Sequence, residues 1–157
     1  MKRHLSASIL IACICLPLSA SGQTVVPSEP GGSTSNWLQN WNELGGGTGA
    51  TTLEGGFALP SAGNAIINGS RTLQVDSVIN TAANTVLINN TNGGGGTADL
   101  EINGGGSLAA ETVIVSTNDD AGTLAVQGGT LNVGGGGVQA RVNGTVDITS
   151  GLSLIHI

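Results

Sequence analysis

The sequence predicts an all-β fold, a β-helix (β-solenoid) in which short strands stack coil upon coil. A phrase of alternating aliphatic and mostly polar residues recurs as TLQV (72–75), DLEI (99–102), TLAV (123–126) and TVDI (145–148). That alternation is the period of a half-buried strand. Steps of 27, 24 and 22 residues separate the leading aliphatic residues, as in solenoid repeats. In addition, 27 of 157 residues are glycine and only 2% are aromatic, which suits a core of thin aliphatic layers.

The register of these phrases predicts which side chains point inward. Two aliphatic columns should form the core, namely Leu73/Val75, Leu100/Ile102, Leu124/Val126 and Val146/Ile148. Gln74, Glu101, Ala125 and Asp147 should form an outward column. Ala125 then separates the two carboxylates, which avoids like charges on adjacent strands.

The first 22 residues predict a secretory signal peptide. A charged start (Lys2 to His4) precedes an apolar stretch (5–18) and small residues at 20–22, so that Gln23 becomes the first mature residue. The apolar stretch is too short to span a membrane. An alternative is a lipoprotein signal, in which the sequence LIAC would place a lipid on Cys13. We therefore expect an exported protein of the bacterial periplasm, outer surface or extracellular space.

Cleavage of the signal peptide changes the chemistry of the remaining chain. Both cysteines, Cys13 and Cys15, are removed with it, so no disulfide is expected. Two basic residues then remain against ten acidic ones, a net charge of −8. A chain so poor in cations lacks the basic surface that binds phosphate backbones, so nucleic-acid binding is not expected.

The segments that precede the coils are expected to be irregular. Residues 23–35 are rich in Pro, Gly, Ser and Thr and predict a flexible leader. Residues 36–64 predict a short N-terminal cap and a first irregular coil, since an open solenoid end exposes its core. Within this range, Trp37, Trp41 and Leu44 share one face of a predicted short helix. The alternative is a tryptophan platform on which sugars stack.

The solenoid coils are predicted over residues 65–151. The first clear strand is expected at 65–68, with others at 85–88, 112–115 and 129–133. Glycine runs are expected at corners, where they permit positive φ and close approach of coils; they lie at 93–96, 104–106 and 134–137. Residues 152–157 break the pattern and match a translated sequencing adapter, so we expect a truncated solenoid with an artefactual end.

No residue is assigned to a catalytic, cofactor or metal site. Glu101 and Asp147 share a column but lie two strands apart, about 10 Å, which is wider than the pair of an inverting glycosidase, about 6.5–9.5 Å. The sequence Asn118-Asp119-Asp120 favours a solvated turn over a Ca²⁺ site, because the calcium-binding repeat is not met. Arg71 and Arg141 are expected to be isolated surface charges.

The stretches PSAGNAIINGSRTLQVDS and TLAVQGGTLNVGGG resemble bacterial autotransporter passenger domains and related glycine-rich exported β-solenoids. The resemblance covers residues 36–150. It implies a right-handed parallel β-helix, export, and roles in adhesion or in a matrix.

We therefore expect an exported structural or adhesive β-solenoid without catalytic activity. Its expected partners are surface polysaccharides or other cell-surface molecules, and further copies of itself through an open C-terminal edge. The alternative is the N-terminal part of a carbohydrate-active β-helix enzyme, a polysaccharide lyase or hydrolase.

Overall fold

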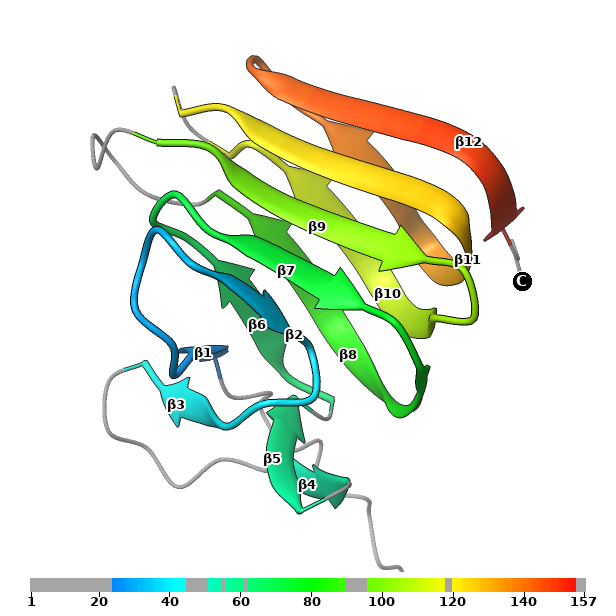
Figure 1. The fold of residues 1–157 in the computed structure, drawn as a ribbon. Helices are drawn as coiled ribbons and strands as arrows, with labels where there is room; N and C mark the ends of the chain where they lie inside the picture. Colours follow the sequence, from blue (N-terminus) through cyan, green and yellow to red (C-terminus); the bar gives the residue numbers. More distant parts are fainter. Residues whose placement is uncertain are drawn as a thin grey trace, which may run out of the picture.

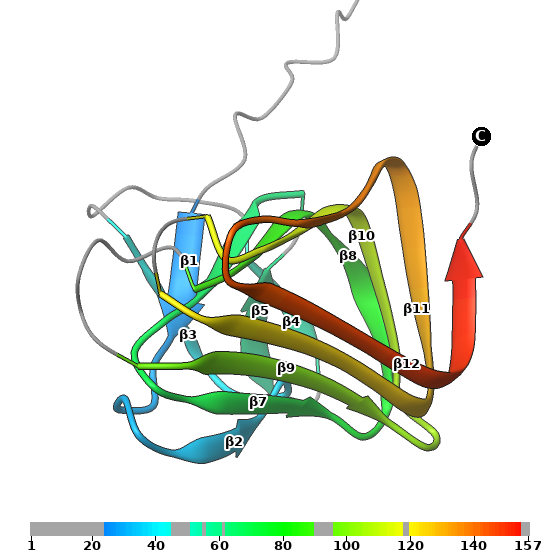
Figure 2. The same ribbon diagram turned by 90° about the horizontal axis from the view of Figure 1, so that it is seen from above.

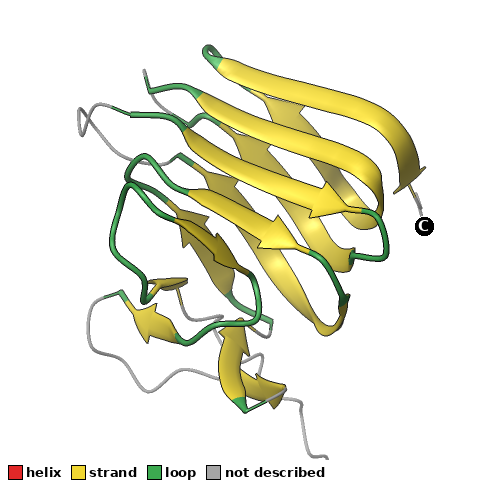
Figure 3. Ribbon diagram, in the orientation of Figure 1, coloured by secondary structure: helices red, strands yellow, loops and turns green. Residues whose placement is uncertain are grey.

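The computed structural model describes residues 24–44, 51–54, 56–60, 62–89, 96–117 and 120–154. The predicted signal peptide lies outside these ranges. Within them the chain forms strands and no helix, which confirms the all-β prediction (Figure 3). The strands are β1 (Thr24–Pro27), β2 (Thr34–Asn36), β3 (Trp41–Glu43), β4 (Thr51–Glu54), β5 (Phe57–Pro60), β6 (Asn64–Ile67), β7 (Thr72–Val75), β8 (Val78–Ile88), β9 (Ala98–Asn103), β10 (Ser107–Val115), β11 (Gly122–Ala140) and β12 (Gly144–Leu154).

The parallel strands stack as successive coils of a β-solenoid of about three turns (Figure 1). β3 runs antiparallel to β1, and β4 and β5 form a separate antiparallel pair. Side A contains β2, β7, β9 and the first parts of β11 and β12, all paired in parallel. The chain then turns into side B (78–83, 107–110 and 130–133) and again into side C (64–67, 85–88, 112–115 and 137–140). Figure 2 shows the bends between these stretches. The right-handed sense of the coil stays a prediction.

The predicted register of side A is confirmed. Leu100 of β9 pairs with Leu73 on one side and with Leu124 on the other, and Leu124 pairs with Val146. The leucines at 73, 100 and 124 are completely buried, as are their partners Val75, Ile102 and Val126. At β12 the columns become accessible: Val146 is half-buried and Ile148 is 40% exposed. Among the described strands, β12 has a neighbour on its β11 side alone.

The outward column also lies where the register places it. Gln74 pairs with Glu101, Glu101 with Ala125, and Ala125 with Asp147. The side-chain amide of Gln74 donates a hydrogen bond to Glu101 Oε2 at 2.9 Å. Ala125 is buried although it lies outside the core cluster, because its methyl group sits between larger neighbours in the same column.

The corner from side C back to side A is held by buried polar residues with positive φ. Asn89 (φ 55°) and Ser116 (φ 59°) follow side C in successive coils, and asparagine tolerates this left-handed conformation best. The Asn89 amide donates to the carbonyl oxygens of Gly96 and Ala121 at 2.9 and 2.7 Å. The Ala121 carbonyl also accepts a hydrogen bond from Ala98 N–H at 3.2 Å. The buried Asn89 amide therefore joins one coil to the next at this corner.

The corner from side A to side B requires glycine at two positions of the predicted run 104–106, namely Gly105 and Gly106. Gly105 has a φ of 89°, and a Cβ on Gly106 would overlap the carbonyl oxygen of Val75 in the preceding coil. The run 134–137 differs from its prediction, because it lies inside β11. There Gly134 to Gly136 oppose the single residue Glu111, since Ala110 pairs with Val133 and Thr112 with Gly137.

The predicted helix around Trp37 to Leu44 is wrong. Trp37 instead continues the side A ladder, because its N–H donates to the Gln74 carbonyl at 2.7 Å. The Asn36 side chain then accepts a hydrogen bond from Leu38 N–H at 2.9 Å, which forms a turn rather than a helical start. From Trp41 the chain runs antiparallel to β1. A spacing of four residues between tryptophans therefore reflects a tight turn that buries both rings.

The segment 23–35 was predicted as a flexible leader, whereas the structure places two strands there. β1 pairs in parallel with β6, and β2 pairs in parallel with β7. Val25 of β1 is buried in the core cluster. Pro27 ends β1, whereas Pro30, Gly31 and Gly32 lie in the turn between these strands, which joins the edges of sides C and A.

Substitution of the corner glycines tests the close approach of coils. Gly106→Ala should lower the free energy of unfolding by about 1–3 kcal/mol, because backbone must move to admit the methyl group. Gly104→Ala is the control, since nothing lies within 4 Å of its added Cβ, and it should change stability by about 0.5 kcal/mol or less. Urea denaturation midpoints measure both, and equal midpoints would contradict the stacking at Val75.

A second pair of substitutions tests side-chain direction on side A. Leu124→Asp should unfold the stack or cost several kcal/mol, because it buries an unpaired carboxylate. Glu101→Gln should cost about 0.5 kcal/mol or less, since an amide can still accept the bond from Gln74. Circular dichroism with urea titration gives both values. Comparable losses for the two variants would show that the register is wrong.

Candidate functional site

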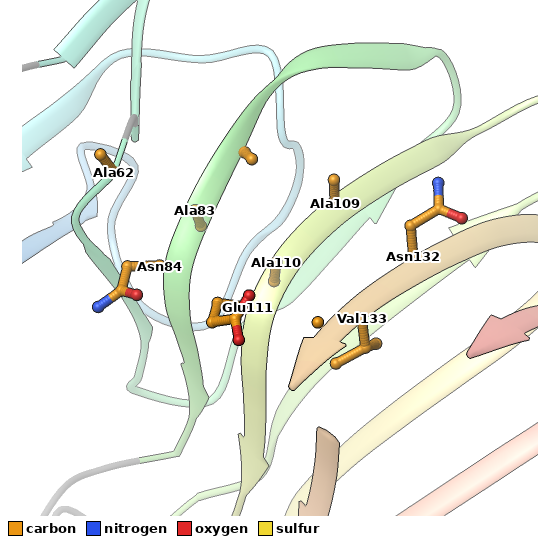
Figure 4. Close-up of a pocket in the computed structure, with 10 residues that line it drawn as sticks. Ala62, Ala83, Asn84, Ala109, Ala110, Glu111, Asn132 and Val133 are labelled. Carbon is orange, nitrogen blue, oxygen red and sulfur yellow. The ribbon is translucent and has the colours of Figure 1, made fainter. Parts of the chain in front are cut away.

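An open groove of about 480 Å³ crosses three successive coils where side B turns into side C (Figure 4). Most of its lining is alanine, valine and glycine. One flank is the outward column Ala82, Ala109 and Asn132, whose members pair with one another across β8, β10 and β11. This column is exposed at Ala82 and half-buried at the other two positions.

The middle of the groove is a second column whose side chains are buried. Ala110 pairs with Ala83 in the coil before and with Val133 in the coil after. These residues belong to the core cluster, so the groove is fixed to the solenoid itself and not to a separate loop. Its position is therefore as rigid as the stacked strands that form it.

The other flank contains Asn84, Glu111 and Gly134. Glu111 is exposed, and its side chain makes no hydrogen bond or ion pair with any described residue. Its carboxylate lies over the glycine run: a Cβ on Gly134 would overlap Glu111 Oε2, and a Cβ on Gly135 would lie 3.2 Å from Oε1. The glycines opposite Glu111 thus make room for its side chain at the edge of the groove.

Sequence reasoning assigned no residue to this groove, although a signal was present. The segments AANTVLI (82–88) and AAETVIV (109–115) are 27 residues apart, the same step as from Leu73 to Leu100. Two consecutive alanines do not add to the alternating hydrophobic pattern by which strands were predicted. They do place short side chains at equivalent outward positions of adjacent coils, which leaves a depression in the surface.

The carboxylates of side A form ladders between coils. Asp76 accepts hydrogen bonds from the amides of Asn36 (3.0 Å) and Asn103 (2.7 Å), and Asp99 accepts one from the Thr72 hydroxyl at 3.4 Å. Glu101 and Asp147 remain separated by Ala125, as the register predicted. The hydrogen bonds give Asp76 and Asp99 a structural role.

Metal ligation finds no support in the described ranges, where no group of three His, Cys, Asp or Glu side chains lies close enough to hold an ion. Of the turn considered for Ca²⁺, Asn118 and Asp119 lie outside the described residues. The Asp120 carbonyl accepts a hydrogen bond from the Ser116 hydroxyl at 2.8 Å, which ties this turn to the corner.

Arg71 is not the isolated surface charge that was predicted. Its side chain is half-buried, and Nη1 donates to the Pro27 carbonyl at 3.2 Å, which fastens the end of β1. Burial lowers the pKa of the guanidinium, and the Glu29 carboxylate opposes that shift. Arg141 is exposed, as expected.

The alternative of a tryptophan platform for sugars is wrong. Trp37 and Trp41 are only 1% and 5% exposed. Their ring centroids lie 4.9 Å apart with a tilt of 55°, and the Trp41 indole N–H donates to the Trp37 carbonyl at 3.2 Å. Both rings fill the interior at the N-terminal end of the stack, so neither offers a face to a ligand.

Substitution of two acidic residues, Asp76 and Glu111, tests which carboxylates stabilise the fold. Asp76→Ala should lower the free energy of unfolding by about 1 kcal/mol, because two amide donors lose their acceptor. Glu111→Ala should change it by about 0.5 kcal/mol or less, since that carboxylate has no partner to lose. Thermal and urea unfolding of the two variants provide the comparison. A larger loss at Glu111 would mean that this side chain supports the corner.

The described residues include no helix that is long and apolar enough to cross a membrane. No protein-family model, curated protein or solved structure matches this chain.

Proposed function

We propose that this chain is an exported β-solenoid with a structural or adhesive role and no catalytic activity of its own. The observation that carries the proposal is the groove across the coils, which presents equivalent residues from successive repeats on one rigid surface. Such a surface suits a ligand that is itself extended and repetitive. The signal peptide predicted for residues 1–22 supports export, and surface polysaccharides are the proposed partners.

Adhesion and export can be tested with the chain expressed from its own start codon in a Gram-negative host. Mass spectrometry of the exported product should give an N-terminus at Gln23, because cleavage is predicted after the small residues at 20–22. Beads coated with this product should bind bacterial cells and their isolated polysaccharide, and should release no reducing ends from it. Retention in the cytoplasm, or release of new reducing ends, would overturn the proposal.

Self-association through β12 forms part of the same proposal. The edge of β12 away from β11 pairs with none of the described strands, and Ile148 beside it is 40% exposed. An unpaired edge next to apolar side chains is a template for another strand.

Light scattering should therefore show association of this chain that rises with protein concentration and with salt. Salt screens the repulsion between acidic chains over about 8–10 Å, whereas edge pairing is a contact interaction. Ile148→Lys is the matched variant, because it places a charge on the edge and should reduce association. A chain that stays monomeric at high salt would contradict this part of the proposal.

A further inference from the structure

We propose that the groove between sides B and C binds an uncharged, extended polysaccharide that runs parallel to the solenoid axis, with Glu111 as its principal hydrogen-bond acceptor. The inference rests on the proposed adhesive function and adds the class of ligand, its direction and the residues that hold it.

The direction follows from the columns. Ala82, Ala109 and Asn132 lie on neighbouring strands, so the groove crosses the strands instead of following one of them (Figure 4). Adjacent strands are about 4.8 Å apart, and an extended glycan advances by a similar distance for each sugar ring. A chain lying across the coils can therefore place successive rings over successive alanines.

An extended peptide is a poorer occupant of this groove. Peptides that bind sheets do so by adding a strand at an edge, where unpaired backbone groups supply hydrogen bonds. Here β10 is paired on both sides, with β8 and with β11. The groove thus crosses backbone that is already satisfied, and recognition depends on side chains and on the apolar surface.

The carboxylate of Glu111 favours a ligand with many hydroxyl groups. An acyl chain in the groove would cover this partnerless carboxylate without bonding to it, which is costly. Sugar hydroxyls donate hydrogen bonds to a carboxylate, and their rings also present C–H groups to apolar surface. The amides of Asn84 and Asn132, on opposite flanks, add donors and acceptors for neighbouring rings.

The charge around the groove selects against anionic polymers. Glu111 is the only ionisable side chain among the residues that line it, and neither lysine nor arginine is present there to pair with a uronate, sulfate or phosphate. The whole chain has a net charge of −6. An anionic glycan would bring its charges towards Glu111 without compensation, whereas a neutral glycan meets no such penalty.

The test measures binding of the whole exported protein to two sets of probes. The neutral probes are hexasaccharides of β-1,4-linked glucose, xylose and mannose, and the anionic probe is hexagalacturonate. Titration followed by ¹H–¹⁵N NMR should show saturable shifts of amides at 82–84 and 109–111 with at least one neutral probe. Its affinity should not depend on salt, and hexagalacturonate should bind at least about tenfold more weakly.

Matched variants locate the site. Ala109→Trp fills the groove and should weaken binding of the neutral probe at least about tenfold, whereas Ala140→Trp, an exposed position on side C, should leave it within about twofold. Glu111→Ala should weaken it about tenfold, as for loss of one hydrogen bond to a charged group. Circular dichroism confirms that each variant is folded; if Ala109→Trp does not fold, Ala82→Trp, at an exposed position, replaces it.

Two outcomes overturn the inference: no neutral hexasaccharide binds, or hexagalacturonate binds as tightly as they do. The bead assay separates this failure from that of the proposed function. If wild-type beads adhere and Ala109→Trp beads adhere equally well, the adhesive function is supported. The groove is then not the adhesive site. Wild-type beads that do not adhere, although hexasaccharides bind at 82–84 and 109–111, would overturn the adhesive function alone.

Discussion

Stacking of aliphatic side chains in register between successive coils is the interaction on which the other features of this chain depend. Leu100 is buried because Leu73 lies on one side of it and Leu124 on the other, and no single coil could enclose it. The hydrophobic free energy therefore accrues between neighbours, as expected for a quasi-one-dimensional protein. β12 has one neighbour among the described strands, and there the same column becomes exposed at Ile148. Burial in this fold is a property of position in the stack.

The same constraint shapes the corners and, through them, the groove. Coils can approach to strand spacing only where the backbone has no side chain in the way, which is why Gly106 lies against Val75. Between sides B and C the coils differ in length, since Gly134 to Gly136 occupy the place of the single residue Glu111. The extra glycines widen the last corner without adding side chains. Glu111 is thereby left exposed beside a trough of alanines.

The sequence predicts the coils far better than the N-terminal segment or the groove. The two-residue period of a strand determines which side chains point inward, and the repeat determines which residues pair. Both columns of side A could therefore be predicted. The turn after β2 could not, because Trp37 and Trp41 at a spacing of four satisfy a helical pattern as well as a turn. Arg71 was misjudged for a related reason: its partner, the Pro27 carbonyl, is 44 residues away. Outward alanines have no periodic signature, and the groove appears only when coils are stacked.

The shallow, alanine-lined groove limits the affinity with which such a surface could hold a glycan. Alanine methyl groups offer little area to each sugar ring, and the buried tryptophans at the N-terminal end add none. Affinity for one short segment should then be weak, since apolar burial contributes only about 25 cal/mol per Å². A polymer that contacts several coils gains from each of them at once, because the first contact raises the effective concentration of the next. Adhesion by this architecture would therefore depend on the number of stacked coils and presented copies, more than on any single residue.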